Sequence, residues 1–165
     1  MLDVGKLEDD TPFIVMEFLE GCDLSTLVDK NGVLPVATAV DYVLQACEAL
    51  AEAHAVGIVH RDVKPSNLFL TTRIDGSPCV KVLDFGISKA MHQVDATQPD
   101  FGMTRTQSVL GSPQYMAPEQ MRSSKRVDGR TDIWAIGTIM HELLTGKSPF
   151  VAETMPELFA MILTD

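Results

Sequence analysis

Residues 58–70 decide the fold, and they have the sequence Ile58-Val59-His60-Arg61-Asp62-Val63-Lys64-Pro65-Ser66-Asn67-Leu68-Phe69-Leu70. Short apolar runs of strand-like composition stand at both ends and enclose a dense polar segment. A loop held between two buried strands can fix polar groups at defined angles, which catalysis requires and folding does not. The stretch therefore predicts a loop that holds Asp62, Asn67 and the intervening Lys64 in fixed positions, as a catalytic site would need.

Composition limits the class of protein. The 165 residues suffice for one domain with a real core, and 45% hydrophobic with 22% charged residues is typical of globular proteins. The net charge of −10 argues against binding to a nucleic-acid backbone. Cys22, Cys47 and Cys79 are odd in number, widely spaced and form no CxxC, so neither a disulfide framework nor a zinc site is expected, and a reducing compartment is favoured.

No membrane segment is expected in this chain. Residues 1–4 do not resemble a signal peptide. The most apolar long run, residues 133–144, contains His141 and Glu142 and is too short to span a bilayer. A cytoplasmic location is therefore predicted, although a longer parent chain could still be tethered to a membrane.

The first half of the chain predicts a hairpin followed by two helices. Residues 2–7 and 12–18 are expected strands joined by an acidic turn. Asp23 is a plausible N-cap for a helix over 24–30. Pro35 opens a long helix whose predicted apolar face consists of Val36, Val40, Val43, Cys47, Leu50 and His54. That face is interpreted as core, with no direct chemistry.

The second half predicts another hairpin and more helices. Residues 67–70 and 80–83 are expected strands around an Asp75-Gly76 turn, with Asp84-Phe85-Gly86 at the exit. Residues 88–110 are polar and are expected to form a long functional loop. Helices are predicted over 131–144, as a central core helix, and over 156–163.

The polar groups suit phosphoryl transfer, which needs an oriented hydroxyl, a clamp on the phosphates and a divalent metal. Asp62 could accept or orient the proton of an attacking hydroxyl, and Lys64 could neutralise the transferred group. Asn67 and Asp84 offer hard oxygen ligands of the kind that Mg²⁺ prefers.

Several short motifs, each weak by itself, occur together in one order. They are His60-Arg61-Asp62 with Lys64 and Asn67, then Asp84-Phe85-Gly86, Ala117-Pro118-Glu119, and Arg130-Thr131-Asp132-Ile133-Trp134 with Gly137. This is the order and the approximate spacing of protein kinases. The chain resembles a bacterial, eukaryotic-type serine/threonine protein kinase. Lys64-Pro65-Ser66-Asn67, and Ser112 within residues 111–115, favour Ser/Thr over Tyr specificity.

The resemblance implies an α+β, protein-kinase-like fold that is incomplete. Residues 1–165 would form a partial kinase domain, in which 1–18 are the small-lobe hairpin, 19–23 the hinge and 24–165 the mostly helical large lobe without its last helices. The implied activity is transfer of phosphate from ATP, with Mg²⁺, to Ser/Thr hydroxyls of protein substrates, and nucleic acid is not an expected partner.

The resemblance also assigns residue roles. Met16 corresponds to the gatekeeper, the backbone of Glu17 and Leu19 would bind adenine, Asp23 would meet the ribose, and Phe69 would form the adenine floor. Plain core packing is the alternative for Met16, Phe69 and Leu2. Asp62, Lys64, Asn67 and Ser112 would be the catalytic group, with Asn67 and Asp84 on the metal. His60, Phe85 and Leu2 would belong to a stacked hydrophobic spine, and Asp132 would anchor the catalytic loop through backbone amides.

A regulatory role is implied for Arg61, which could pair with a phosphorylated residue and order the activation loop. The candidates are Thr104, Thr106 and Ser108. The alternative interpretation is that these three are ordinary polar loop residues.

Part of the kinase pattern is absent from this sequence, which has no GxGxxG and no Val-Ala-x-Lys. Glu119 is expected to be left without its usual arginine. We therefore expect a fragment of a longer kinase or a truncated product, which by itself is marginal in stability and weak or inactive as a catalyst. Two alternatives to a working kinase remain: an inactive remnant that binds partners, and a small-molecule phosphotransferase, against which Lys64 and residues 117–119 count.

Overall fold

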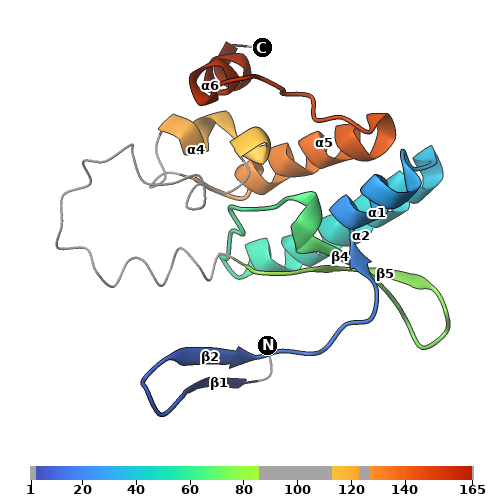
Figure 1. Cartoon of the computed structure of the whole chain (residues 1–165), viewed down its shortest axis with the longest axis vertical. Helices are drawn as coiled ribbons and strands as arrows, with labels where there is room; N and C mark the ends of the chain where they lie inside the picture. Colours follow the sequence, from blue (N-terminus) through green and yellow to red (C-terminus); the bar gives the residue numbers. More distant parts are fainter. Residues whose placement is uncertain (1–2, 86–112, 123–126, 165) are drawn as a thin grey trace.

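The computed structural model describes residues 3–85, 113–122 and 127–164. Its elements are β1 (Asp3–Lys6), β2 (Pro12–Val15), β3 (Cys22–Asp23), α1 (Leu24–Asn31), α2 (Val36–Ala55), η1 (Pro65–Asn67), β4 (Leu68–Thr72), β5 (Pro78–Val82), η3 (Pro113–Tyr115), α4 (Pro118–Arg122), α5 (Arg130–Thr145) and α6 (Met155–Thr164). Helices and strands both contribute, so the predicted α+β class is confirmed. The β1–β2 hairpin lies at one end of the molecule and α6 at the other (Figure 1).

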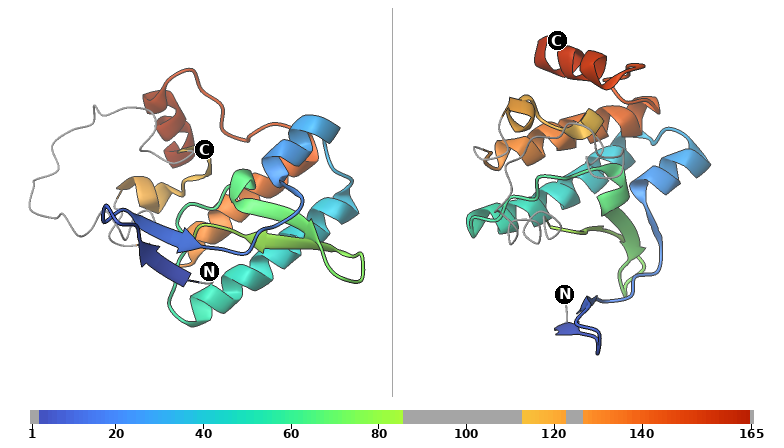
Figure 2. Two further views of the ribbon diagram at one scale, coloured as in Figure 1. Left: turned by 60° about the horizontal axis from the view of Figure 1, so that its bottom comes forward. Right: turned by 60° about the vertical axis from the view of Figure 1, so that its left-hand side comes forward.

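The predicted first hairpin is present and antiparallel, with Lys6 opposite Pro12 and Asp3 opposite Val15. The prediction that its second strand continues to residue 18 is wrong. Val15 already pairs with Asp3, the first described residue of β1, so the following residues leave the ladder and form a connecting segment (residues 16–21). The right-hand view of Figure 2 shows the hairpin extending away from the helices.

The central sheet has the order β3-β4-β5. Residues opposite one another on paired strands share a face of the sheet. Leu68 opposes Val82, and Leu70 opposes Val80, on the face that packs into the core. Phe69 opposes Lys81 on the other face. Leu68 is fully buried, and a truncation there to Ala would be expected to cost about 2–5 kcal/mol of stability.

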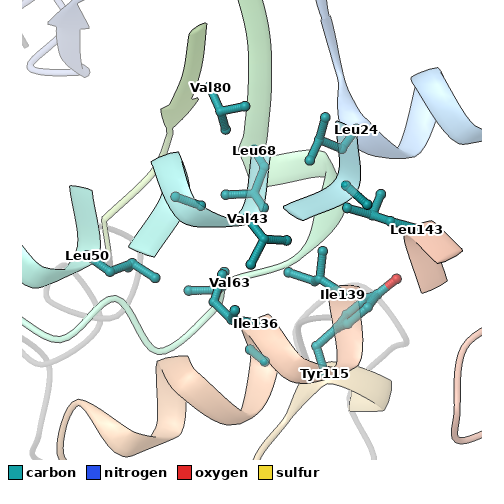
Figure 3. Packing of buried hydrophobic residues seen from close by; sticks show 13 residues of the cluster. Leu24, Val43, Leu50, Val63, Leu68, Val80, Tyr115, Ile136, Ile139 and Leu143 are labelled. Carbon is teal, nitrogen blue, oxygen red and sulfur yellow. The ribbon is translucent and has the colours of Figure 1, made fainter. Parts of the chain in front are cut away.

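Helix α2 packs against β5 and α5, but the face that it buries differs from the prediction. The buried residues are Ala39, Val43, Ala46 and Leu50. Val36 and Val40, both expected in the core, are 66% and 36% exposed. The buried face keeps spacings of four and three, and it is rotated toward the alanines because small side chains let a helix approach a sheet and a second helix closely. Val43, Leu68 and Ile139 meet between these layers (Figure 3).

Helix α5 is the predicted central helix. Its buried residues, which include Asp132, Ala135, Ile139 and Leu143, face α2 and the catalytic loop. It ends at Gly146, whose φ of 74° is left-handed and whose N–H donates to the Glu142 carbonyl oxygen at 2.8 Å. Among the described residues, no helix is both long and apolar enough to cross a membrane. The three cysteines are free and partly buried.

Candidate active site

The catalytic-loop segment lies between the end of α2 and β4. The prediction of a strand on each side is therefore wrong on the upstream side. Ile58 is half exposed, and its N–H donates to the Ala53 carbonyl oxygen at 2.9 Å as part of the end of the helix. On the downstream side, the turn η1 leads into β4, and the Asn67 N–H donates to the Lys64 carbonyl oxygen at 2.9 Å. The loop is thus fixed by a helix end and one strand.

Asp132 holds the start of this loop, as the sequence predicts. Its side chain is buried, and its Oδ2 and Oδ1 atoms accept the backbone N–H groups of His60 at 2.9 Å and Arg61 at 2.8 Å. Arg61 has a φ of 69°, a left-handed conformation that costs of order 1–3 kcal/mol for a residue with a side chain. The two hydrogen bonds that Asp132 accepts hold the backbone in that conformation.

His54 contacts the Asp132 carboxylate, a contact that the sequence interpretation missed. Its Nε2 lies 2.7 Å from Asp132 Oδ2. The ring fits because Gly129 has no side chain: a Cβ there would lie 2.7 Å from His54 Nδ1. The only sequence signal was the position of His54 on an apolar helix stripe, which indicates core and not a contact with a carboxylate far away in the chain.

The structure brings Asp62, Lys64 and Asn67 together. Lys64 Nζ lies 3.1 Å from Asp62 Oδ2. The Asn67 side chain is buried, and its Nδ2 donates to the Asp62 backbone carbonyl oxygen at 2.8 Å. Because the amide nitrogen makes that bond, the amide oxygen is turned away from it and can serve as an acceptor or ligand.

Asp84 lies next to this group along the backbone. The N–H of Leu83, its neighbour, donates to the Asn67 carbonyl oxygen at 2.8 Å, and the Leu83 carbonyl oxygen lies 2.8 Å from His60 Nε2. Phe85 contacts the buried His60 ring, with centroids 4.9 Å apart, as predicted. Asp84 itself has a φ of 58°, so the chain turns sharply between two residues tied to the catalytic loop.

These donors fit Mg²⁺. One amide oxygen and one carboxylate are hard ligands, and Mg²⁺ usually takes few protein ligands beside substrate phosphates. In the described part of the chain, no three His, Cys, Asp or Glu side chains gather as a dedicated metal site would require. Asn67 and Asp84 are the candidate residues to hold Mg²⁺.

The residues expected around the nucleotide come from the connecting segment, from β4 and from the start of α1. Met16, Glu17 and Leu19 belong to the connecting segment, and Phe69 lies on β4. Asp23 caps α1, as predicted: it accepts from Thr26 N at 2.9 Å and from Thr26 Oγ1 at 2.8 Å. Burial acts to raise the pKa of Asp23, but these two hydrogen bonds outweigh it and hold the pKa below its usual value.

Gln120 joins the catalytic loop to the Ala117-Pro118-Glu119 segment, which sequence reasoning did not foresee. Its Nε2 donates to the Arg61 carbonyl oxygen at 2.8 Å, and its Oε1 accepts the Ala117 N–H at 3.0 Å. Glu119 was expected to be left without its arginine, and the structure gives its carboxylate a different donor. Thr131 Oγ1 donates to Glu119 Oε1 at 2.9 Å, so the carboxylate is hydrogen-bonded to the start of α5.

Tyr115 makes a second link to α5. Its hydroxyl donates to Glu142 Oε2 at 2.6 Å. Burial, and then this hydrogen bond, raise the pKa of Tyr115, so it stays protonated as a donor. Five residues assigned roles from the sequence lie outside the described residues: Leu2, Thr104, Thr106, Ser108 and Ser112.

Comparison with known families agrees with this geometry. The model of the family described as "Protein kinase domain" matches residues 4–165. The chain belongs to the protein kinase domain family.

Similar curated proteins include bacterial serine/threonine kinases, in agreement with the resemblance seen in the motifs. The probable serine/threonine-protein kinase PknB of Corynebacterium glutamicum is 42% identical over 157 residues, which cover 93% of this chain and 23% of that protein. Serine/threonine-protein kinase Pkn1 of Myxococcus xanthus is 48% identical over 139 residues, 84% of this chain and 19% of that protein. PknB of Mycobacterium leprae is 39% identical over 155 residues, which cover 92% of this chain and 23% of that protein. The chain spans about a quarter of the length of these relatives or less.

Proposed function

We propose that this chain supplies the catalytic centre of a protein kinase that transfers the γ-phosphate of ATP to serine and threonine hydroxyls of proteins. The observation that carries the proposal is the anchoring of the catalytic loop by Asp132, which fixes the backbone directly before Asp62. Residues that must act together in phosphoryl transfer gain most from such fixed positions.

Each residue of the proposed catalytic group has its own role in the reaction. Asp62 accepts the proton of the substrate hydroxyl as the hydroxyl oxygen bonds to the γ-phosphorus and the bond from that phosphorus to ADP breaks. The ammonium of Lys64, 3.1 Å from the Asp62 carboxylate, offsets negative charge on the group in transfer. The hydrogen bond from the Asn67 side chain (Nδ2) to the Asp62 backbone carbonyl oxygen keeps the two residues at a constant spacing. Ser112 completes the proposed catalytic group.

Asn67 and Asp84 would hold Mg²⁺, which when bound offsets the charge of the phosphate oxygens. Adenine would contact the backbone of Glu17 and Leu19, with Met16 beside it and Phe69 as its floor. Asp23 would face the ribose while it caps α1.

Regulation would act through Arg61, with Thr104, Thr106 or Ser108 as the phosphorylated partner. The backbone of Arg61 is tied on both sides, to Asp132 and to Gln120, so its side chain starts from a fixed position. Phosphopeptide mapping of the active protein tests this role: modification within residues 104–108 is expected, and an unmodified segment in a fully active sample contradicts it.

The partners and location follow from the same proposal. Proteins with serine and threonine hydroxyls are the substrates, the net charge of −10 disfavours nucleic acid, and the site operates in the cytoplasm. A second candidate is a catalytically inactive module that binds partners.

Phosphoryl transfer by the protein at its natural length separates the two candidates. The protein is incubated with Mg²⁺ and γ-labelled ATP and a mixture of serine-, threonine- and tyrosine-containing peptides, and the modified residues are identified by mass spectrometry. The proposal predicts phosphoserine and phosphothreonine, with loss of labelling when Mg²⁺ is chelated. Absence of transfer to any peptide or to the protein itself would support the inactive module.

A further inference from the structure

The face of the β4–β5 hairpin that points away from the core is in contact with the connecting segment (residues 16–21). Phe69 and Lys81 oppose one another on this face. Lys81 Nζ lies 2.6 Å from Glu17 Oε2. Thr71 lies two residues after Phe69 on β4 and therefore on the same face of the sheet. Its Oγ1 donates to the Glu20 carbonyl oxygen at 2.7 Å. Two side chains of the sheet thus hold the two ends of a short stretch of the connecting segment.

The close approach of Gly21 shows how tightly this stretch lies against β4. A Cβ on Gly21 would meet the Leu70 carbonyl oxygen at 2.0 Å and the Phe69 ring at 3.2 Å, and the φ of 144° is one that side chains rarely allow. The backbone that follows Glu17 is therefore fixed by a steric contact at Gly21, by a hydrogen bond at Glu20 and by an ion pair at Glu17.

Lys81 connects the two sides of the proposed adenine site. It lies directly across the ladder from Phe69, the proposed floor, and it binds Glu17, whose backbone is proposed to bind the adenine edge. We propose that Lys81, acting through Glu17, is a positioning residue that sets the distance between the connecting segment and Phe69 and thereby the affinity for ATP. This inference rests on the proposed function, and it adds a residue that neither the motifs nor the catalytic loop contains.

The expected effect is moderate because both side chains are partly exposed, 37% for Lys81 and 62% for Glu17. Exposed ion pairs contribute about 0.2–1 kcal/mol, which corresponds to a change in ATP affinity of about 1.4-fold to fivefold. The change is expected in the KM for ATP and in the directly measured Kd, with little change in kcat, because Lys81 acts on a segment outside the catalytic loop. Added salt should reduce the difference between variant and wild type.

Four variants of the natural-length protein test the inference by calorimetric titration with Mg-ATP. Lys81→Met and Glu17→Gln each remove one partner and should weaken binding. The charge-reversed double variant Glu17→Lys with Lys81→Glu should recover most of the lost affinity. Lys6→Met is the matched control, because it removes the exposed Lys6–Asp10 pair, 3.2 Å apart at the hairpin turn, and should bind ATP as the wild type does.

The outcomes distinguish this inference from the proposed function. Unchanged ATP affinity in Lys81→Met, or an equal loss in Lys6→Met, overturns the positioning role of Lys81 alone. A double variant that binds no better than the single variants also overturns it, since the pairing of opposite charges is then not what matters. A wild-type protein that binds no Mg-ATP overturns the proposed function and this inference with it.

Discussion

Oδ2 of Asp132 accepts the backbone N–H of His60 at 2.9 Å and lies 2.7 Å from Nε2 of His54. One buried carboxylate on α5 therefore joins the end of α2 to the start of the catalytic loop, and its second oxygen adds Arg61. Because the carboxylate is 1% exposed, these protein donors replace the water that it would otherwise bind. The loop geometry thus depends on a residue some seventy positions away in the chain.

Replacing Asp132 with Ala should lower the free energy of unfolding by about 3–5 kcal/mol, because two buried N–H groups and the His54 ring lose their acceptor. Urea denaturation, monitored by the fluorescence of Trp134, measures the free energy of unfolding. Trp134 is the single tryptophan of the sequence and lies on the same helix as Asp132. Asp128→Asn is the control, since Asp128 lies exposed near the same helix end, and its urea midpoint should stay near that of the wild type. A midpoint in Asp132→Ala close to that of the control would contradict the anchoring role.

Gly129→Ala should destabilise the protein by about 1–3 kcal/mol, because the new Cβ would lie 2.7 Å from His54 Nδ1 and push the ring off Asp132. Gly137→Ala is the matched change on α5: its Cβ meets nothing within 4 Å, and the gain in helix propensity should stabilise by about 0.5–1 kcal/mol. Thermal unfolding of both variants gives the comparison. Equal shifts in Tm would show that the fit of His54 against Gly129 carries no energy.

Thr131→Val removes the hydroxyl that donates to Glu119 and keeps the shape of the side chain. A partly buried carboxylate then loses a donor, and a cost of about 1–3 kcal/mol is expected in urea denaturation. Thr131→Ser keeps the hydroxyl and should recover much of the loss. A Thr131→Val variant as stable as the wild type would contradict a stabilising role for the hydrogen bond to Glu119.

Asp23 gives a prediction about pH. Its pKa in the folded protein is held below the usual 3.8. The stability that the charged carboxylate contributes is therefore fully present above pH 3.8 and is lost as the pH falls through the lowered pKa. Asp23→Asn can still cap α1 but cannot titrate in this range. The free energy of unfolding of the wild type, relative to that of Asp23→Asn, should therefore decline between about pH 5 and about pH 2. A difference that does not vary with pH would show that the carboxylate charge does not contribute to the cap.

Much of the architecture was predictable because it depends on local patterns. The cap at Asp23, the hairpin at its Asp75-Gly76 turn and the apolar run of α5 each follow from neighbouring residues, and the ordered motifs located the catalytic loop. The prediction for α2 wrongly placed Val36 in the core, because alanines carry little hydrophobic signal in a sequence. In the structure, alanines are buried because α2 packs closely between the sheet and α5.

Contacts between distant residues were beyond sequence reasoning except where a family motif implied them. Asp132 was expected to bind backbone amides, but nothing in the pattern indicated that His54 would join it. Thr131 as the partner of Glu119, the bridge by Gln120 and the pair of Lys81 with Glu17 depend on how elements pack. Their spacing in the chain carries no periodicity that a single sequence could reveal.

The central claim is that Asp62 acts on the substrate hydroxyl in a loop preorganised for phosphoryl transfer. Its most direct test compares kcat for peptide phosphorylation in the natural-length wild type and in Asp62→Asn, at saturating Mg-ATP, with Mg-ATP affinity measured in parallel. We expect kcat to fall by roughly 10²–10⁴-fold while nucleotide affinity stays close to that of the wild type. Phosphorylation by Asp62→Asn at the wild-type rate would contradict the account.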